Sequence, residues 1–321
     1  MSSANDVPET YGLSGEDAWE TLRSAGRLRL IRDAFRRLRA ADGFSHARST
    51  AFISELVLVQ GIIALVGLAS LLHRGGLSDV IVRTLKEAAP GPAGEVLTKA
   101  VTQAHQAGHG HTLALTLGVI GALISGTTLM GQMERAMNRL YGIERDRPTI
   151  RKYGRAFVMA LSAGILIAVA FVAIGFGRQV AASLDSDLAV RIWGLARWPV
   201  ALVLLAAAVA AIFRWAPNRH QPQWSWLAFG ATISVGLWIA VTALLSWFFS
   251  ISTTFGETYG PLAGVVALLL WALLSSIAVL FGGAIAAQLE AVRAGDPAPQ
   301  MDRDLRDTSV EAAVHDAPLP V

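Results

Sequence analysis

Uncharged apolar stretches divide most of the 321-residue chain into six segments, each long enough to cross a bilayer. A membrane-spanning helix needs about 20 mainly apolar residues. Backbone groups inside lipid must be hydrogen-bonded within the chain, so spans of this length are helical. The pattern therefore predicts an all-α, polytopic membrane helix bundle with six transmembrane helices. We expect them at residues 51–72, 112–133, 156–177 and 195–213, within 221–256 and within 258–289.

The second stretch carries a row of small and polar residues at helical spacing. Steps of three and four place the whole row on one face of a helix. Lipid does not tolerate such a face, so we expect it to lie against protein or water. It is interpreted either as a functional surface or as a helix-packing face that ends in charged anchors. The row comprises Gly118, Gly121, Ser125, Thr128, Gln132, Arg135 and Arg139.

Lysine and arginine are distributed unevenly among the connections between these spans. They are abundant before the first span, between the second and third, and between the fourth and fifth, whereas the connection between the last two spans has none. Short connections rich in lysine and arginine stay in the cytoplasm. Both the N terminus and the C terminus are therefore predicted to be cytoplasmic.

Residues 1–48 are predicted to form a cytoplasmic segment with a basic amphipathic helix over 16–41. Ser14, followed three residues later by Asp17, is typical of a capped helix start. A basic helix with an apolar row suits the membrane surface or, alternatively, the protein's own cytoplasmic loop. Nucleic acid is not an expected partner, because acidic residues dilute the charge and no aromatic platform accompanies it. The apolar row is Trp19, Leu22, Ala25, Leu28, Ile31, Phe35 and Leu38.

The remaining chain is assigned to a membrane domain at residues 49–290 and a tail at 291–321. Within the membrane domain, residues 73–111 are expected to form an extracytoplasmic helical cap that breaks at Pro90-Gly91-Pro92. The tail is rich in proline and acidic residues and has little apolar surface to bury. We therefore predict a disordered cytoplasmic tail.

The composition argues against a soluble enzyme. Charged residues make up 16% of the chain, against about 25% in an average soluble domain. The chain contains no cysteine, which excludes disulfides and thiolate metal sites. Walker A, H-E-x-x-H and G-x-S-x-G motifs are absent from the sequence, and no cluster of Asp, Glu and His suggests a hydrolytic metal centre. We therefore expect no enzymatic activity, no cofactor and no metal site.

Glu55 is an acidic residue inside the predicted first span. At about 1.5 Å per residue it lies only ~6 Å deep. A charge at that depth costs far less than at the bilayer centre. Glu55 is interpreted either as a carboxylate that pairs with Arg48 or a loop arginine, or as a proton or cation site of a coupled carrier.

Three segments resemble the YihY/BrkB family. They are RAMNRLYG at residues 135–142, RWAPNR at 214–219, and the run that opens YGPLAGVV and closes AIAAQLE at 259–290. The resemblance extends over most of residues 30–290 and implies a six-span inner-membrane protein with cytoplasmic ends. The opening HARSTAFISELVLVQ before and within the first span is similar to the branch that includes YhjD-like proteins.

The resemblance also implies a role in envelope integrity, linked to movement of lipids or lipopolysaccharide precursors. The family carries an old ribonuclease BN label, which no metal-ligand or acid–base cluster in this sequence supports. Where the family pattern has an acid and often an asparagine in the last span, this chain has Ile285 and Ala287. A mechanism that rests on that acid is in doubt here unless Gln288 or Glu290 replaces it.

Together these observations suggest a bacterial inner-membrane envelope-integrity protein that transports or flips a lipid or another amphiphile. Membrane lipids are the expected partners, with an anionic lipid or amphiphile as substrate, and a homo-oligomer is compatible with the sequence. Arginine binds phosphate through paired hydrogen bonds, so the arginines that end the polar row could hold an anionic headgroup. The candidate headgroup and path residues are Arg135, Asn138, Arg139, Gln132, Thr128, Ser125 and Glu55.

The alternative hypothesis is a non-transporting structural or assembly factor of the cell envelope that binds partner proteins. The N-terminal helix and the extracytoplasmic cap would then be the working surfaces. Deleting residues 1–40 should abolish the function of such a factor and largely spare a transporter.

Overall fold

The six apolar segments form six long helices. The computed structural model describes residues 4–71, 91–106, 111–183, 187–252 and 262–299, with single positions between 82 and 89. All regular elements within these residues are helices. The spans are α3 (Gly43–Leu71), α6 (His111–Leu140), α7 (Thr149–Ser183), α8 (Asp187–Trp215), α9 (Trp224–Ile251) and α11 (Ala263–Arg293), accompanied by α1 (Gly15–Ala25), α2 (Arg27–Ala40) and α5 (Gly91–Gln106).

The prediction of six spans is confirmed, because each of these six helices is long and apolar enough to cross a membrane. Several run beyond the uncharged stretches. For example, α6 continues past residue 133 to Leu140, through a segment that contains Glu134, Arg135 and Arg139. Glutamate and arginine are good helix formers, so the helix does not end where the apolar run ends.

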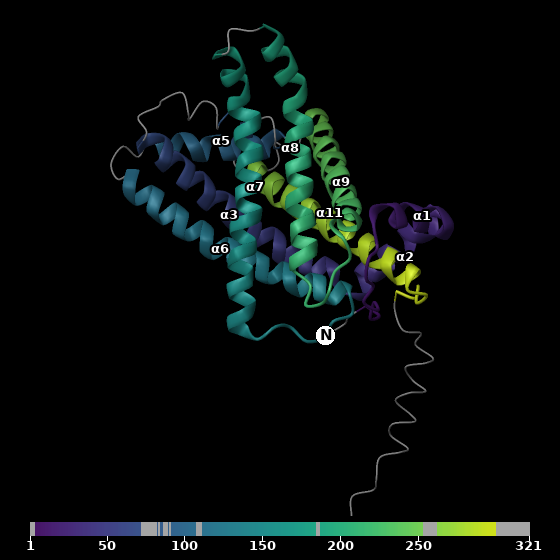
Figure 1. Cartoon of the computed structure of the whole chain (residues 1–321). Helices are drawn as coiled ribbons and strands as arrows, with labels where there is room; N and C mark the ends of the chain where they lie inside the picture. The colour runs from purple at the N-terminus through teal and green to yellow at the C-terminus, as the bar shows by residue number, and fades with distance from the viewer. Residues whose placement is uncertain are drawn as a thin grey trace, which may run out of the picture.

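The spans are arranged as a ring in chain order. Each span packs against the spans before and after it, and α11 returns to pack against α3. Spans that are joined by short connections, such as α6 and α7, lie side by side and antiparallel. In Figure 1 the α3–α6 pair runs obliquely past the nearly upright α7–α8 pair.

The α3–α6 contact depends on glycines that let the two backbones touch. A Cβ added at Gly118 of α6 would lie 2.5 Å from the backbone nitrogen of Ala64 in α3. A Cβ at Gly121 would lie 2.5 Å from the side-chain oxygen of Gln60. Small residues permit this close approach of membrane helices. The first part of the polar row on α6 is therefore a packing face.

The largest buried core lies at one end of the ring, which we call the terminal end. The N-terminal segment, the α6–α7 and α8–α9 connections, and the C-terminal turn of α11 meet there. A second, smaller core joins α3, α5 and α11 towards the opposite end, with Ala93, Leu97 and Val101 of α5 buried in it. The bundle is thus held together at both ends, by different sets of helices.

The basic segment before the first span forms two helices rather than the single helix predicted over 16–41. The break falls at Gly26, whose φ of 84° belongs to the left-handed region that favours glycine. The expected cap is present: the Ser14 side chain accepts from the Asp17 backbone, and the Asp17 carboxylate accepts from the Ser14 backbone at 2.8 Å. The first helix therefore begins where the sequence indicated.

The break at Gly26 also changes which face of the second helix is buried. The face of α2 that packs inward contains Leu30, Ala34 and Leu38. Two of these lie outside the predicted apolar row, and the row's members Leu28, Ile31 and Phe35 are exposed instead. The predicted row assumes one continuous helix. The break at Gly26 rotates α2 relative to α1, so a different face of α2 is buried.

Other expectations fall partly outside the described residues. The tight hairpin that the sequence predicts between the last two spans falls on residues 253–261, which lie wholly outside the described residues. Of the expected tail, residues 291–293 belong to α11, and the carbonyls of Pro297 and Pro299 accept hydrogen bonds from Gln288 and from the backbone of Asn5. Residues 300–321 are not described.

We predict that Gly118→Ala destabilises the protein by about 1–3 kcal/mol, the usual cost of overpacking. The added methyl group must push α3 and α6 apart. Gly164→Ala on α7 is the matched control, because a Cβ there meets no atom within 4 Å. The comparison is made by thermal unfolding in detergent. Equal melting temperatures for the two variants would contradict the close backbone contact.

We also predict that the terminal end faces the cytoplasm. Because the chain has no cysteine, single cysteines report without background. A membrane-impermeant maleimide added to intact bacteria should label Lys99→Cys on α5, and should label Arg151→Cys at the start of α7 only after permeabilisation. The reverse labelling pattern would show that the orientation inferred from the arginines is wrong.

Candidate functional site

An N-terminal strap, residues 4–13, crosses the terminal end of the ring. The backbone nitrogens of Ala4 and Val7 donate to the carbonyls of Arg139 and Tyr141 at 3.1 Å each. At the other end of the strap, the Leu13 carbonyl accepts from the backbone of Gln223 at 3.2 Å. The strap thus connects the end of α6 to the start of α9.

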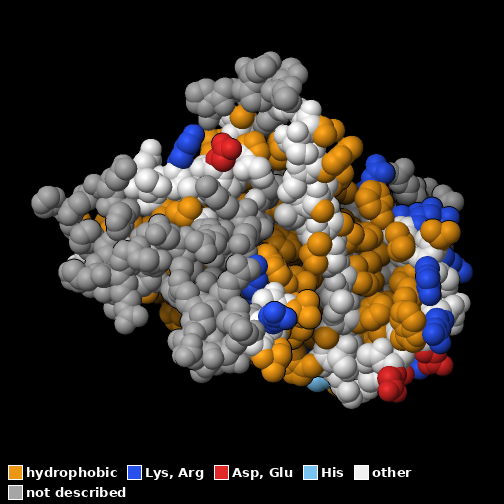
Figure 2. Space-filling view, turned by 90° about the horizontal axis from the view of Figure 1, so that it is seen from above, with side chains coloured by type: hydrophobic (Ala, Val, Ile, Leu, Met, Phe, Trp, Pro, Cys, Tyr) orange, Lys and Arg blue, Asp and Glu red, His pale blue; other side chains and the backbone are white. Residues whose placement is uncertain are grey.

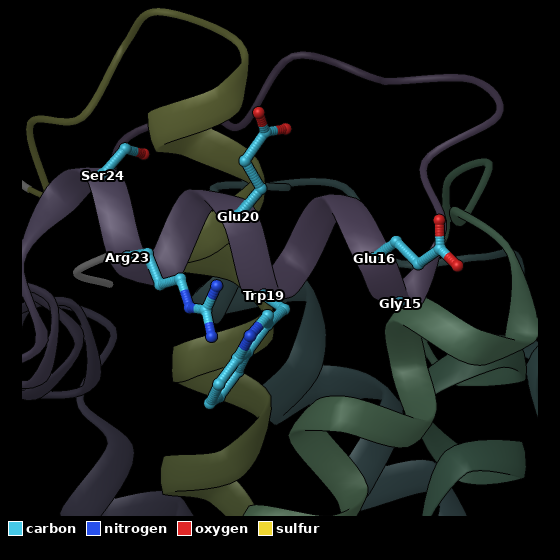
Figure 3. Close-up of a pocket in the computed structure, with 6 residues that line it drawn as sticks. All are labelled: Gly15, Glu16, Trp19, Glu20, Arg23 and Ser24. Atoms are coloured by element: carbon cyan, nitrogen blue, oxygen red, sulfur yellow. The ribbon is translucent and has the colours of Figure 1, made fainter.

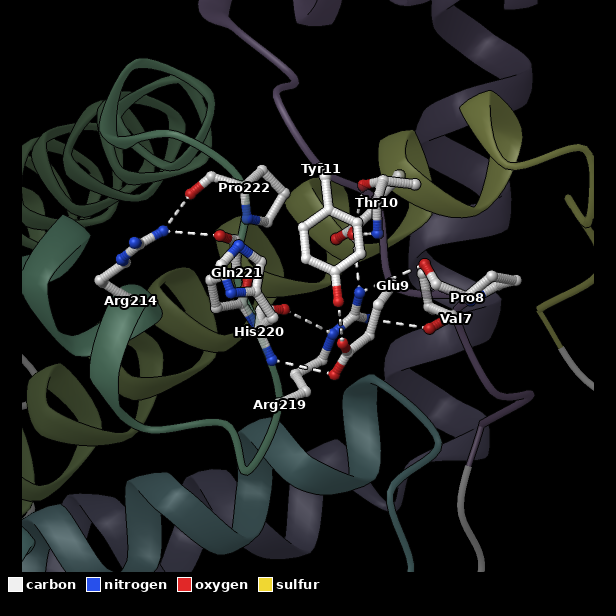
Figure 4. Close-up of polar contacts among 11 residues, drawn as sticks. Val7, Pro8, Glu9, Thr10, Tyr11, Arg214, Arg219, His220, Gln221 and Pro222 are labelled. Atoms are coloured by element: carbon white, nitrogen blue, oxygen red, sulfur yellow. Dashed lines mark hydrogen bonds and ion pairs between the residues drawn. The ribbon is translucent and has the colours of Figure 1, made fainter.

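A buried ion pair lies beneath the strap. Arg219, in the α8–α9 connection, lies 2.7 Å from Glu290 near the end of α11, and their side chains are 4% and 0% exposed. The Thr10 hydroxyl donates to the same carboxylate oxygen at 2.6 Å. Arg219 also donates to the carbonyls of Val7 and Pro8 at 2.8 and 3.2 Å, as Figure 4 shows. One guanidinium therefore connects the strap, the loop and the last span.

Three further side chains complete this arrangement. The Arg219 guanidinium lies 4.8 Å from the ring centre of Tyr141, within range of a cation–π interaction. Arg37 of α2 donates to the side chain of Gln288 at 2.7 Å and to the carbonyl of Leu140 at 3.1 Å. We call Thr10, Arg37, Tyr141, Arg219, Gln288 and Glu290 the closing network.

Burial shifts the pKa values of Arg37 and Tyr141 in the closing network. Burial lowers the pKa of Arg37 to about 10, so the guanidinium still carries its charge at neutral pH. Burial raises the pKa of the Tyr141 hydroxyl, the Glu290 charge adds to this, and the nearby arginines oppose it. Tyr141 is therefore neutral at every physiological pH.

The closing network retains unused hydrogen-bonding capacity. Among the described residues, the Tyr141 hydroxyl, the second Glu290 oxygen and one terminal nitrogen of Arg37 are buried without a hydrogen-bond partner. The side chain of Gln221 acts to lower the pKa of the Tyr141 hydroxyl, but the two groups are not aligned for a hydrogen bond. Unpaired buried polar atoms are rare and costly in folded proteins.

The sequence-predicted residues at the end of α6 lie together and hold the α6–α7 connection. Asn138 is fully buried: its amide donates to Asp146 at 2.9 Å and its oxygen accepts from the backbone of Asn218 at 2.8 Å. Arg139 is also buried and donates to the carbonyls of Ile143 and Glu144 at 3.4 and 3.2 Å. Arg135 is partly exposed and lies 3.6 Å from Asp146.

Asp146 is the acceptor on which this group converges. Lys152 lies 2.9 Å from its second oxygen. Burial disfavours the Asp146 carboxylate, but the hydrogen bonds from Lys152 and Asn138 outweigh that effect and lower its pKa below the ordinary value. The carboxylate is therefore ionised at neutral pH.

Further arginines bind backbone carbonyls at the end of α8. Arg147 pairs with the buried Glu134 at 3.2 Å and donates to the carbonyls of Ala216 and Pro217 at 2.8 and 2.6 Å. Arg214 donates to the carbonyls of Gln221 and Pro222. The last carbonyls of a helix lack partners within the helix, and cations near them are favourable.

The other sequence-predicted residues lie apart from this cluster. Ser125 and Gln132 of α6 are half-buried, and the exposed Thr128 donates back to the Ile124 carbonyl of its own helix at 2.9 Å. Glu55 of α3 is half-buried, makes no ion pair among the described residues, and has one buried oxygen without a hydrogen-bond partner. The expected pair with Arg48 is not formed. The roles assigned to these four residues stay predictions.

Sequence reasoning missed most of the closing network. Thr10 and Arg37 gave no signal beyond their segment's charge, and Arg219 was interpreted only as an orientation signal and as part of RWAPNR. Gln288 and Glu290 were noted as replacements for the missing acid of the last span, which is the sequence signal that could have found the site. Glu290 lies 71 residues along the chain from its partner Arg219 and 280 residues from its partner Thr10.

We predict strong energetic coupling between Arg219 and Glu290. Removing one partner leaves a buried charge unpaired, so Arg219→Gln or Glu290→Gln alone should cost about 3–5 kcal/mol. The double variant should cost clearly less than the sum of the two. Thermal or denaturant unfolding in detergent measures all four proteins.

The matched control is the surface pair of Arg293 and Glu20, which has a similar separation of 3.2 Å but side chains that are 39% and 68% exposed. Its coupling should be below about 1 kcal/mol. Equal coupling in the two cycles would mean that burial adds nothing to the Arg219–Glu290 pair.

Comparisons with known proteins confirm the resemblance to the BrkB family that the three sequence segments indicated. The sequence profile of a family described as Virulence factor BrkB matches residues 34–306. YfkH of Bacillus subtilis, named as ribonuclease-like, is 26% identical over 264 residues, which cover 81% of this chain and 94% of YfkH. A UPF0761 membrane protein of Methylibium petroleiphilum is 29% identical over 185 residues, which cover 56% of this chain and 43% of the relative.

A UPF0761 membrane protein of Idiomarina loihiensis is 24% identical over 186 residues, which cover 58% of this chain and 65% of the relative. The chain therefore spans nearly all of one relative and less than two thirds of the other two. No solved structure matches the chain. Because the profile covers most of the sequence, including all six spans, the chain belongs to the BrkB family of membrane proteins.

Proposed function

We propose that the protein moves a lipid or another amphiphile across the bacterial inner membrane, and that the terminal end is its closed gate. The observation that carries the proposal is the difference in packing between the two ends of the ring. A carrier needs one end that closes tightly and a path that is open towards the other side.

The packing differs most clearly along α7 and α8. The main core takes its buried α7 residues from positions 156–163 and its buried α8 residues from positions 208–213, all at the terminal end. Further from that end, Leu188, Ile192 and Leu195 of α8 are strongly exposed. In this proposal, these exposed residues of α8 are the part of the wall that is accessible from the membrane or the opposite side.

The closing network has properties suited to a gate. It joins the strap, α2, α6, the α8–α9 connection and α11 through a few polar side chains, so a small rearrangement would release several helices together. A ligand that favours the rearranged network would shift the population towards it.

Arg135 is the arginine of the α6 cluster that is most accessible for a headgroup. Its side chain is 41% exposed, whereas Arg139 and Asn138 are buried and bonded to the α6–α7 connection. In this proposal Arg135 contacts an anionic group, and Arg139 and Asn138 position the connection beside it. Ser125, Thr128 and Gln132 lie further along the same helix and remain the candidate path.

The rival function is a structural or assembly factor that moves nothing. Deletion of residues 1–40 no longer separates the two functions, because Thr10 and Arg37 belong to the closing network. Such a deletion would disturb the bundle of a transporter as well. Single substitutions that preserve the fold are needed instead.

We predict that Thr10→Val accelerates lipid movement. The substitution keeps the shape of the side chain and removes a hydrogen bond to a charged carboxylate, which is worth about 1.5–3 kcal/mol. If the open arrangement lacks this bond, its population rises by roughly 10- to 100-fold. The assay uses liposomes that contain the purified protein, a headgroup-labelled lipid and an impermeant quencher, with and without an ion gradient.

Two threonines of the same shape serve as comparisons. Thr232→Val on α9 is the control, because its hydroxyl bonds only to the Ala228 carbonyl of its own helix; it should behave as the unmodified protein. Thr128→Val tests the candidate path. Loss of labelled signal no faster than in empty liposomes, for anionic and neutral lipids under all gradients, would exclude lipid transport. Transport with an unchanged rate in Thr10→Val would exclude the gate.

A further inference from the structure

The second basic helix, α2, presents an apolar sector away from the protein. Leu28 is 85% exposed, and Ile31 and Phe35 are each 48% exposed, while the opposite face of the helix packs on the bundle. These three residues recur at steps of three and four and form one stripe. A stripe of large apolar side chains on a helix that is otherwise rich in charge requires an apolar partner.

A basic sector lies next to the apolar stripe. Arg29, Arg32 and Arg36 are exposed and surround a single carboxylate, that of Asp33, at 3.5–3.8 Å. One negative charge cannot neutralise three guanidiniums, so a positive excess remains on this sector. Figure 2 shows lysine and arginine side chains along the right-hand rim, where Figure 1 places α1 and α2, beside apolar side chains.

The neighbouring helix α1 has the same two-sided character. In Figure 3, Trp19 and Arg23 point down beside the ribbon of α11, whereas Glu20 and Ser24 point to the opposite side. The Arg23 guanidinium lies 4.9 Å from the centre of the Trp19 ring, and the indole is partly exposed. Tryptophan and arginine together are typical of the headgroup layer of a membrane.

The position of α2 in the chain places its apolar stripe next to the start of the first membrane span. Only two residues separate the end of α2 at Ala40 from the start of the first span at Gly43. The ring of Phe35 contacts that of Phe44 in the first turn of α3, with centres 5.9 Å apart. The stripe on α2 therefore continues into the outer surface of a membrane span, where Phe52 is also exposed.

We propose that α1 and α2 form a binding surface for anionic phospholipids in the leaflet on the terminal side of the membrane. Leu28, Ile31 and Phe35 enter the boundary between headgroups and acyl chains. Arg29, Arg32 and Arg36 bind the phosphates of lipids with a net negative charge. The complementary charge selects anionic lipid over zwitterionic lipid, and the apolar stripe selects a lipid surface over a soluble anion.

The first measurement locates the stripe relative to the bilayer. A single cysteine at Ile31 is labelled with an environment-sensitive dye in the full-length protein, which has no cysteine of its own. The protein is reconstituted in vesicles of phosphatidylcholine with phosphatidylglycerol and with lipids that carry a shallow quencher. We expect strong quenching at Ile31→Cys and little at Glu20→Cys, which faces away from the bilayer. Equal weak quenching at both positions would overturn the proposal.

The second measurement tests selectivity for anionic lipid. Phosphatidylglycerol is titrated into the dye-labelled protein in a zwitterionic detergent, and the apparent affinity is compared with that of Arg29→Gln/Arg32→Gln. Loss of two arginines near an anionic surface should weaken the apparent affinity by about tenfold or more. Arg145→Gln/Arg151→Gln, at exposed positions of the α6–α7 region, removes the same charge and should leave the affinity unchanged.

Three results would overturn the proposal. Equal weakening in the two double variants would mean that only net charge matters. Equal binding of phosphatidylcholine and phosphatidylglycerol would remove the role of the basic sector. Efficient cross-linking of Ile31→Cys between two copies in vesicles, without quenching by lipid, would show that a second copy of the chain covers the stripe.

Discussion

The packing of the terminal end depends on hydrogen bonds to backbone carbonyls that have no partner within a helix. Helices α6 and α8 both end there, and a helix end exposes carbonyls without partners. Arg37, Arg147 and Arg219 each donate to two carbonyls that belong to the strap or lie at or just after helix ends. The guanidinium suits this task because it offers five donors in a rigid plane. Two of these arginines have their buried charge balanced by carboxylates: Arg147 by Glu134 and Arg219 by Glu290.

This arrangement explains why positive charge at the terminal end has two different meanings. Arginines such as Arg29 and Arg32 are exposed and act through the field they create. Others, such as Arg37 and Arg219, are buried and act through specific hydrogen bonds. Counting both kinds together predicts membrane orientation, because insertion depends on total charge near the spans. It does not predict which arginines hold the fold.

The spans could be predicted from sequence because burial in lipid imposes a local rule on composition, and the Ser14–Asp17 cap could be predicted because it is a contact within four residues. The break at Gly26 was missed, since a glycine in a helical pattern indicates a break only weakly. It reversed the exposure of Leu28 and Leu30 relative to the expected row. The closing network could not be predicted, because its members are separated by tens to hundreds of residues and no local pattern joins Thr10 to Glu290. The spacing of the polar row on α6 showed that its residues share one face of the helix. It could not show that Gly118 and Gly121 pack on α3 whereas Arg139 holds the α6–α7 connection.

The route of the strap has a consequence for biogenesis. Residues 4–13 are synthesised before all six spans, whereas their partners Arg219 and Glu290 are synthesised after the fourth span and at the end of the sixth. The strap must therefore wait on the terminal side of the membrane while all six spans insert. The closing network can form only after α11 is in place, so the docking of the strap follows the insertion of the last span. A chain truncated before α11 would keep the strap undocked and the polar groups of the α8–α9 connection uncovered, which gives quality-control proteases a direct way to distinguish unfinished molecules from complete ones.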